Sequence, residues 1–259
     1  MDLGLEGKTI LISGGARGIG AAIARACARE RAVPVILDRD ATAISELQEE
    51  LRREGLASER ILADLTDVAQ SSNAIGNFAA AYGRIDALVN NAGVNDGVGL
   101  EQGDAEAFLA SLNRNLVHYY LVAYTLLPFL KKSRGAIVNI ASKVAVTGQG
   151  GTSGYAAAKG AILGLTTDWA AELAEYGIRV NTILPAEVIT GLYERWLQKF
   201  ENPEEKRHQI SSRIPLGRRM TQPKEIADMV VVLLSPWSTT TGQQIFVDGG
   251  YVHLDRALA

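Results

Sequence analysis

The chain has 259 residues, of which 47% are hydrophobic and 21% are charged, and its formal net charge is -3. This length and apolar content suffice for one large α/β core. No Pro-, Ser- or charge-rich linker interrupts the sequence, so we expect a single domain over residues 1–259. The small negative charge, without a basic stripe, argues against a nucleic-acid partner.

Two segments bear on membranes and location. Residues 1–8 do not show the basic segment followed by an apolar segment that a signal peptide requires. The longest apolar stretch, 116–130, contains His118 and Pro128 and is too short to span a bilayer. We therefore expect a cytoplasmic protein with no membrane partner. The single cysteine, Cys27, cannot close an internal disulfide, and its small neighbours favour a packing role.

Short β-rich apolar runs alternate with longer helical segments along the chain. This alternation is typical of repeated βαβ units, which form a parallel sheet covered on both faces. We predict strands at 9–13, 33–38, 59–63, 87–90, 136–142, 179–184 and 244–247. The helices between them are expected to begin near Gly18, Thr42, Asp67, Asp104, Ser153 and Pro223. The predicted fold class is α/β, with a doubly wound parallel seven-stranded sheet in three αβα layers.

One region, residues 191–220, fits this alternation poorly. It follows the sixth predicted strand and is rich in Glu, Arg, Lys and Gln around Trp196 and Phe200. An insertion at this point lies over the carboxyl ends of the strands, where open α/β sheets bind ligands. We interpret the region as a lid over a substrate.

A glycine-rich turn connects the first predicted strand to the first helix. Glycine lets the backbone approach a pyrophosphate closely, and the helix N-terminus offers unpaired N–H groups to it. The spacing is G-x-x-x-G-x-G, so the general dinucleotide pattern alone is weak evidence, but its position between strand and helix strengthens it. We predict that this turn binds the cofactor through Gly14, Arg17, Gly18, Ile19 and Gly20.

The second predicted strand ends at Asp38, where such folds carry a ribose-binding acid. A carboxylate there accepts hydrogen bonds from the ribose hydroxyls and repels a 2′-phosphate, which favours NAD. Arg17 and Arg39 point the other way, since either guanidinium could pair with that phosphate. NAD is thus the favoured cofactor, and NADP stays open.

Tyr155 and Lys159 are four residues apart in a predicted helix, so both side chains lie on one face. A free tyrosine has a pKa of about 10 and is a poor base near neutrality. A nearby ammonium, helped by the positive nicotinamide ring of an oxidised cofactor, stabilises the phenolate and lowers that pKa. Tyr155 could then remove a hydroxyl proton as hydride leaves.

These motifs, in this order and spacing, resemble the short-chain dehydrogenases/reductases along nearly the whole chain. The matching positions are the glycine turn, Asp64, the segment 90–93, Asn115, Ser142, and Tyr155 with Lys159. The resemblance implies a Rossmann-type fold with four catalytic residues. In it, Ser142 orients the substrate oxygen, Tyr155 transfers the proton, Lys159 binds the nicotinamide ribose, and Asn115 supports a water-linked proton path.

The same resemblance implies further cofactor contacts. Asp64 and Leu65 border the adenine, while Val188 and Thr190 contact the nicotinamide carboxamide. Contacts are also implied for Asn91, Ala92, Gly93 and Pro185. Many members have Pro-Gly after the sixth strand, whereas this chain has Pro185-Ala186-Glu187, which brings a carboxylate beside the expected substrate pocket. A structural surface acid is the rival explanation for Glu187.

The segments expected to surround the reacting carbon are 94–97, 147–153 and 187–196. They are rich in amide, hydroxyl and carboxylate groups, which suits a polyhydroxylated small molecule. Buried polar groups without partners cost about 1–3 kcal/mol each, so an apolar ligand is disfavoured. We predict substrate contacts from Asn95, Ser142, Gln149, Tyr155, Glu187, Tyr193 and Trp196.

At a finer level the chain resembles the L-fucose dehydrogenase branch of the family, through segments 91–97, 114–120, 147–150, 185–188 and 248–256. This implies oxidation of the anomeric hydroxyl of L-fucose, or of a related aldose such as D-arabinose, to the lactone. One alternative is a reductase of 3-oxoacyl or hydroxysteroid carbonyls. Another is a nucleotide-binding scaffold without activity, against which the intact Ser142, Tyr155 and Lys159 argue.

Assembly and metal content complete the expectations. The family resemblance implies a homotetramer, in which the long helices from Asp104 and Ser153 pack against their symmetry mates. His118, His208 and His253 do not form a ligand cluster with nearby acids or the cysteine, so no metal is predicted. His118, beside two tyrosines, is interpreted as a packed and hydrogen-bonded residue.

Overall fold

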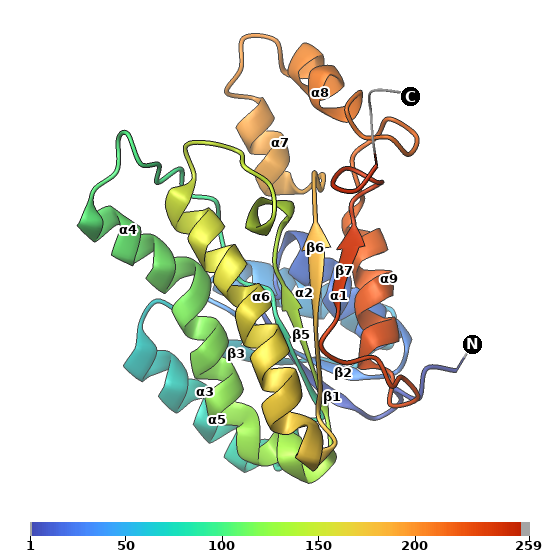
Figure 1. The fold of residues 1–259 in the computed structure, drawn as a ribbon. Coiled ribbons are helices and arrows are strands. Elements are labelled where there is room, and N and C mark those ends of the chain that lie inside the picture. The colour runs from blue at the N-terminus through green and yellow to red at the C-terminus, as the bar shows by residue number, and fades with distance from the viewer. Residues whose placement is uncertain (1, 255–259) are drawn as a thin grey trace.

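The computed structural model describes residues 2–254 and places a parallel sheet between two layers of helices, as Figure 1 shows. Residues 255–259, part of the predicted domain, lie outside the described residues, as does residue 1. The strands are β1 (Thr9–Ser13), β2 (Val33–Asp38), β3 (Glu59–Leu62), β4 (Ala87–Asn90), β5 (Ala136–Ile140), β6 (Arg179–Pro185) and β7 (Gln244–Val247). They pair in the order β3-β2-β1-β4-β5-β6-β7, entirely in parallel. The predicted α/β fold with a doubly wound seven-stranded sheet is confirmed.

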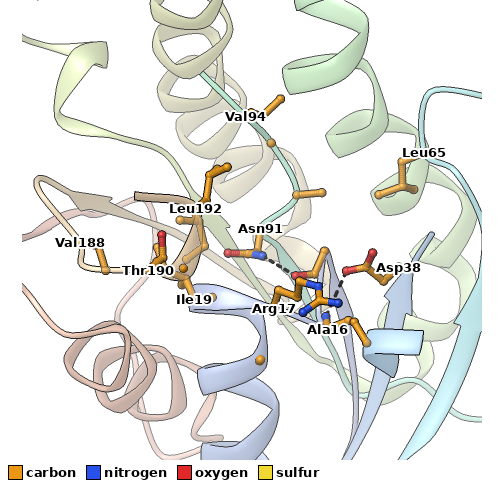
Figure 2. A pocket seen from close by; sticks show the side chains of 18 of the residues that line it. Ala16, Arg17, Ile19, Asp38, Leu65, Asn91, Val94, Val188, Thr190 and Leu192 are labelled. Atoms are coloured by element: carbon orange, nitrogen blue, oxygen red, sulfur yellow. Dashed lines mark hydrogen bonds between the residues drawn. The ribbon is translucent and has the colours of Figure 1, made fainter. Parts of the chain in front are cut away.

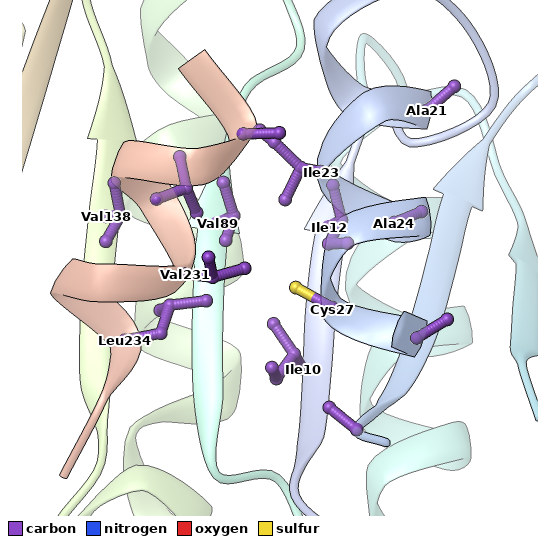
Figure 3. Packing of buried hydrophobic residues seen from close by; sticks show 14 of the residues in the cluster. Ile10, Ile12, Ala21, Ile23, Ala24, Cys27, Val89, Val138, Val231 and Leu234 are labelled. Carbon is purple, nitrogen blue, oxygen red and sulfur yellow. The ribbon is translucent and has the colours of Figure 1, made fainter. Parts of the chain in front are cut away.

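Successive residues of the central strands serve opposite faces of the sheet. Ile10 and Ile12 pack with α1 (Gly18–Arg29), α2 (Ala41–Arg53) and α9 (Pro223–Leu234), as Figure 3 shows for α1 and α9. Leu11 packs on the other face with α3 (Val68–Tyr82), α5 (His118–Ser133) and α6 (Ser153–Leu173). Both faces are covered, so β1 and β5 are buried at every residue, as parallel strands require.

Cys27 belongs to the first of these two cores and is fully buried between α1 and the sheet (Figure 3). Burial raises the pKa of its thiol to about 12. A thiol that stays protonated is a poor nucleophile, so Cys27 is a packing residue.

The helix starts follow local capping chemistry. The carboxylates of Asp67 and Asp104 accept hydrogen bonds from Gln70 N and Ala107 N at the starts of α3 and α4 (Ala105–Leu112), as the sequence predicts. Helix α2 begins at Ala41, one residue before the predicted Thr42, because the Asp40 side chain caps it. Pro223 occupies the first turn of α9.

Some boundaries differ from the prediction. β3 ends at Leu62 and β5 at Ile140, whereas we expected them to continue to 63 and 142. Ser142 instead precedes a 3₁₀ turn, Lys143–Ala145, and its hydroxyl accepts a hydrogen bond from Val144 N. The hydroxyl therefore lies beyond the edge of the sheet, where a loop can present it to a ligand.

The chain crosses the sheet at its centre. After β1 it proceeds outward through β2 to β3, and it then returns to place β4 on the other side of β1. The carboxyl ends of β1 and β4 thus flank the switch point where doubly wound sheets bind ligands. Between α4 and α5 the helix widens into a π-turn, Asn113–Val117, which contains Asn115.

The segment 191–220 holds α7 (Gly191–Leu197) and α8 (Pro203–Ser211), which stand beyond the carboxyl ends of β6 and β7 in Figure 1. Trp196 packs edge-on against Tyr193 and Phe200, with ring centroids 5.2 and 4.8 Å apart. This placement suits a lid, and its movement stays a prediction. Across residues 2–254, no helix has both the length and the apolarity needed to cross a bilayer.

Candidate active site

A cleft of about 770 Å³ lies over the carboxyl ends of the strands and is lined by most of the predicted site residues. Figure 2 shows Asp38 and Leu65 at one end and Val188, Thr190 and Leu192 at the other, with Arg17 and Asn91 between them. Ser142, Tyr155 and Lys159 also belong to its wall. One cavity therefore joins the expected dinucleotide groove to the expected reaction site.

The glycine turn fits a pyrophosphate. Gly14 has a φ of +60°, and a Cβ there would lie 2.9 Å from Ala92 Cα. A Cβ on Gly20 would lie 2.0 Å from the carbonyl oxygen of Gly14. Helix α1 begins after Arg17, whose side chain makes no capping hydrogen bond. The first N–H groups of α1 thus face the cleft without a side-chain partner, which is the arrangement that binds phosphate.

Asn91 braces this turn from β4. Its Nδ2 donates to the carbonyl oxygens of Ser13 and Gly14, at 3.0 Å each. The Ser13 hydroxyl in turn accepts from Asn91 N at 3.0 Å and from Ala92 N at 3.2 Å. These bonds join β1 to β4 at the switch point, so the residues 91–93 hold the cofactor turn in place as well as lining the cleft.

The ribose end carries three acids and two cations. The Asp38 carboxylate accepts hydrogen bonds from Ala16 N and Asp40 N, at 3.1 Å each. Arg17 forms an ion pair with Asp40 at 2.9 Å, and Arg39 forms one with Asp64 at 3.3 Å. Hydrogen bonds from Thr66, backbone first, lower the pKa of Asp64. Both guanidinium groups therefore already have acidic partners.

Lys159 is held by β5 and by a tyrosine. Its ammonium donates to the carbonyl oxygen of Ile140 at 2.7 Å and to the Tyr119 hydroxyl at 3.0 Å. The Tyr119 hydroxyl itself donates to Ile140 O at 2.8 Å, so its lone pairs face the ammonium. Lys159 and Tyr119 are both buried, and no acid pairs with Lys159 within the described residues.

Burial shifts the pKa values of both Tyr155 and Lys159. Burial raises the pKa of Tyr155 to about 12, although a hydrogen bond with Ser142 opposes this. Burial also lowers the pKa of Lys159 to about 7, because the ammonium has no counter-charge. The Lys159 Nζ lies 5.6 Å from the Tyr155 ring centroid and donates its hydrogen bonds to other groups. The predicted lowering of the phenol pKa by this ammonium together with an oxidised nicotinamide ring stays a prediction.

Asn115 is buried in the π-turn and serves the loop after β4. Its Oδ1 accepts from Val94 N at 2.7 Å, and its Nδ2 donates to Ser111 O at 3.1 Å. A Cβ on Gly93 would lie 3.0 Å from this Oδ1 and 3.4 Å from Lys159 Nζ. Asn115 thus positions the segment beside Lys159, and its part in a water-linked proton path stays a prediction.

The predicted substrate residues do not all reach the cleft. Asn95, Ser142, Tyr155 and Tyr193 line it. Glu187 lies behind Tyr193, whose hydroxyl donates to its carboxylate at 2.7 Å. Gln149 and Trp196 are exposed and do not line the cleft. The predicted cofactor residue Gly20 does not line it either, and lies within the first turn of α1. The exposed position of Gln149 follows from its place in a loop of three nearby glycines.

Other residues at the site were not predicted. Tyr119 contacts Lys159 in the structure, and Lys143 follows Ser142 in the sequence. In the sequence, the position of Lys143 next to Ser142 was the only feature that could have indicated it. His118 lines the cleft and its Nε2 bonds to Arg114 O at 3.0 Å, while its Nδ1 has no partner among the described residues. Burial lowers the pKa of His118 to about 4, so the ring is neutral near pH 7. It is packed and hydrogen-bonded, as interpreted, but it also lines the cleft.

Comparison with known proteins agrees with this geometry. A family model described as enoyl-(acyl carrier protein) reductase matches residues 14–252. The chain is 38% identical over 252 residues to 3-oxoacyl-acyl-carrier-protein reductase FabG of Thermotoga maritima, covering 96% of this chain and 99% of that protein. It is 36% identical over 245 residues to L-fucose dehydrogenase of Oryctolagus cuniculus, covering 94% and 84%.

The fold also matches a solved structure closely. The crystal structure of Cj0485 dehydrogenase superposes with a TM-score of 0.94 at 45% identity, covering 99% of this chain and 98% of that one. Matches of this extent include the glycine turn, the catalytic segment and the region 191–220 together. The chain therefore belongs to the short-chain dehydrogenase/reductase family and is an NAD(P)-dependent oxidoreductase.

Proposed function

We propose that the protein oxidises the anomeric hydroxyl of L-fucose, or of a related aldose such as D-arabinose, to the lactone. The observation that carries this proposal is the polar wall at the reaction end of the cleft. Asn95, Arg114, His118 and Tyr193 line it beside Ser142 and Tyr155. Such a wall offers several directional hydrogen bonds to a polyhydroxylated substrate, whereas an apolar one would leave the buried His118 Nδ1 without a partner. The similarity to L-fucose dehydrogenase supports the same choice.

The reaction removes a proton from the hydroxyl oxygen and a hydride from the carbon that bears it. In the proposed mechanism, Ser142 holds this oxygen by a hydrogen bond and Tyr155 accepts the proton. Lys159 binds the nicotinamide ribose and, in its protonated form, places positive charge behind the phenol. A bound oxidised cofactor supplies the hydride acceptor and the additional positive charge that a phenol with a pKa of about 12 requires.

We infer a preference for NAD over NADP from the ribose end of the groove. Each Asp38 oxygen accepts one backbone hydrogen bond, which leaves acceptor sites for two ribose hydroxyls. Arg17 and Arg39 are engaged with Asp40 and Asp64, so neither is an unpaired receptor for a 2′-phosphate. We also propose that the glycine turn contacts the pyrophosphate, that Asp64 and Leu65 border the adenine, and that Val188 and Thr190 contact the nicotinamide, as the family resemblance implies.

A cofactor-by-substrate activity matrix tests the proposal. NAD⁺ and NADP⁺ are each combined with a panel of aldoses, and formation of the reduced cofactor is followed by absorbance. We expect turnover of L-fucose or a stereochemically related aldose, with the higher kcat/KM for NAD⁺. Absence of turnover with every aldose, together with efficient turnover of a steroid or an oxoacyl substrate, overturns the assignment.

A second candidate is reduction of a 3-oxoacyl carbonyl, which the 38% identity to FabG favours. The same catalytic residues would run the reaction in the opposite direction. The polar wall argues against it, since an acyl chain needs apolar lining. Oxidation of a reduced cofactor by a 3-oxoacyl thioester, at a rate exceeding that of aldose oxidation, would favour this candidate.

A further inference from the structure

A buried ion pair lies directly beside the catalytic serine. Lys143 and Glu187 form it, and their side chains are 9% and 15% exposed. In each other ion pair within the described residues, at least one partner is 30% exposed or more. Lys143 follows Ser142 in the chain, and Glu187 follows the cleft residues Pro185 and Ala186. The pair thus joins the two loops that border the reacting carbon.

The surroundings connect this ion pair to the lid. The Tyr193 hydroxyl, on α7, donates to Glu187 Oε2 at 2.7 Å, and Tyr193 itself lines the cleft. On the other side, Lys143 Nζ lies 4.0 Å from the centroid of the Tyr251 ring. The Tyr193 side chain therefore contacts both the carboxylate and the cleft. A ligand that binds the pair from the cleft would displace this side chain.

Stability does not explain the pair. Removing two charges from water costs several kcal/mol per ion, and apolar residues of similar size often serve a core equally well. Both groups can bind more than each other, since a carboxylate has about four acceptor sites and an ammonium has three donors. Within residues 2–254, two donors reach this carboxylate, from Lys143 and Tyr193. The pair is suited to a ligand that both donates and accepts hydrogen bonds.

We propose that Lys143 and Glu187 bind two adjacent hydroxyl groups of the substrate, those on C2 and C3 beside the oxidised C1. Each hydroxyl can donate to the carboxylate and accept from the ammonium, so a vicinal diol matches the pair. Because the pair is neutral overall, a substrate carboxylate at this position would be repelled by Glu187 as it approached Lys143. The substrate class is therefore a neutral polyol rather than a sugar acid. This inference rests on the proposed aldose oxidation, and it assigns the selection of the sugar to Lys143 and Glu187.

The test compares substrates that differ by one hydroxyl. Lys143→Met, Glu187→Gln and the double variant are assayed with the best aldose and with its 2-deoxy analogue. We expect each variant to lose about 10- to 100-fold in kcat/KM on the full aldose, mainly through a higher KM, since a hydrogen bond to a charged group is lost. On the deoxy analogue the loss should stay below about threefold. Equal losses on both sugars overturn the proposal and make the pair structural.

Two controls separate folding effects from recognition. The double variant leaves no unpaired buried charge, so its loss of discrimination cannot come from a stranded ion. Lys224→Met removes an exposed ion pair with Asp228 on α9 and should leave both sugars unaffected. NAD⁺ affinity, measured by calorimetry, should stay within about twofold of the wild type in all variants. A variant that loses cofactor affinity as well contradicts a role confined to the substrate.

The role of Lys143 and Glu187 can still be tested if the aldose assignment is wrong. Glycerol and propane-1,3-diol then replace the two sugars, because glycerol oxidised at C1 keeps adjacent hydroxyls on C2 and C3, and propane-1,3-diol lacks only the one on C2. A wild-type preference for glycerol that vanishes in the variants supports the binding of adjacent hydroxyls by Lys143 and Glu187 even when no aldose reacts. Turnover of propane-1,3-diol at least equal to that of glycerol overturns this binding role alone. No turnover of any sugar or alcohol overturns both proposals.

Discussion

Tyr155 and Lys159 show how burial alone can oppose the chemistry that a motif suggests. Burial raises the pKa of Tyr155 to about 12 and lowers that of Lys159 to about 7. Both shifts favour the neutral form of each group. The phenol of Tyr155 is therefore protonated near neutral pH when no cofactor is bound. In the proposed mechanism the oxidised cofactor supplies the activating charge, which would confine proton removal to the complex in which hydride can also be transferred.

The first prediction concerns pH. A general base acts when unprotonated, and the pKa of Tyr155 is raised, so oxidation should be slow at neutral pH and should accelerate as the pH rises. We expect kcat/KM for oxidation to increase about tenfold or more between about pH 7 and 9, while reduction declines at the alkaline end. Tyr155→Phe should lower kcat by about 10²- to 10⁴-fold. A pH-independent rate in the wild type contradicts this role.

A second prediction concerns the Tyr119 hydroxyl. It accepts a hydrogen bond from Lys159, so Tyr119→Phe removes a partner of the buried ammonium and should lower the pKa of Lys159 further. The weaker positive charge then raises the pKa of Tyr155. The acid limb of the kcat/KM profile should move upward by about 0.5 to 1 pH unit. Tyr120→Phe, on the same helix but exposed, is the control. If the acid limb of the kcat/KM profile does not move in Tyr119→Phe, the proposed influence of Tyr119 on Tyr155 through Lys159 is refuted.

Among the elements, the turn before α1 depends most strictly on its sequence. Gly14 and Gly20 face each other across it, and the Asn91 side chain fills the remaining space. Strands, caps and the switch point were predictable because they follow local periodicity and side-chain chemistry. The contacts of Lys159 with Tyr119 and of Lys143 with Glu187 were not, since they join residues 40 and 44 positions apart. Such pairs depend on how α5, α6 and β6 pack.

The third prediction tests the turn. A Cβ on Gly20 would meet the Gly14 carbonyl oxygen at 2.0 Å, so Gly20→Ala must displace the backbone that receives the pyrophosphate. We expect the free energy of unfolding to fall by about 1–3 kcal/mol and cofactor binding to be lost. Gly76→Ala, in the interior of α3, meets only a methyl group at 3.8 Å. It should raise stability by about 0.5–1 kcal/mol with binding unchanged. Calorimetry measures both quantities.

At the scale of the whole molecule, one apolar surface has no cover within the described residues. Leu109, Val117, Tyr120 and Tyr124 are 41–66% exposed along α4, the π-turn and α5. Tyr120 and Tyr124 stack on each other with centroids 6.1 Å apart. Exposed apolar groups gathered on neighbouring helices mark an association surface. This surface lies where the family resemblance implies contact between symmetry mates. Association through it stays a prediction, as does the cytoplasmic location of the protein.

The fourth prediction is therefore a homotetramer. Sedimentation equilibrium should give about four times the chain mass of 27.7 kDa. Tyr124→Glu introduces a charge within this surface and should yield smaller species, whereas the exposed substitution Asp228→Ala should not. A wild-type protein that sediments only as a monomer at micromolar concentration contradicts the prediction.

The central claim is that hydride leaves the anomeric carbon of a sugar and enters the nicotinamide. The most direct measurement uses L-fucose, or the best aldose of the panel, carrying deuterium at C1, with NAD⁺ as acceptor. Mass spectrometry of the reduced cofactor should show one deuterium, and the sugar product should be the lactone without it. Reduced cofactor that contains no deuterium, or none formed from any labelled aldose, would contradict the account.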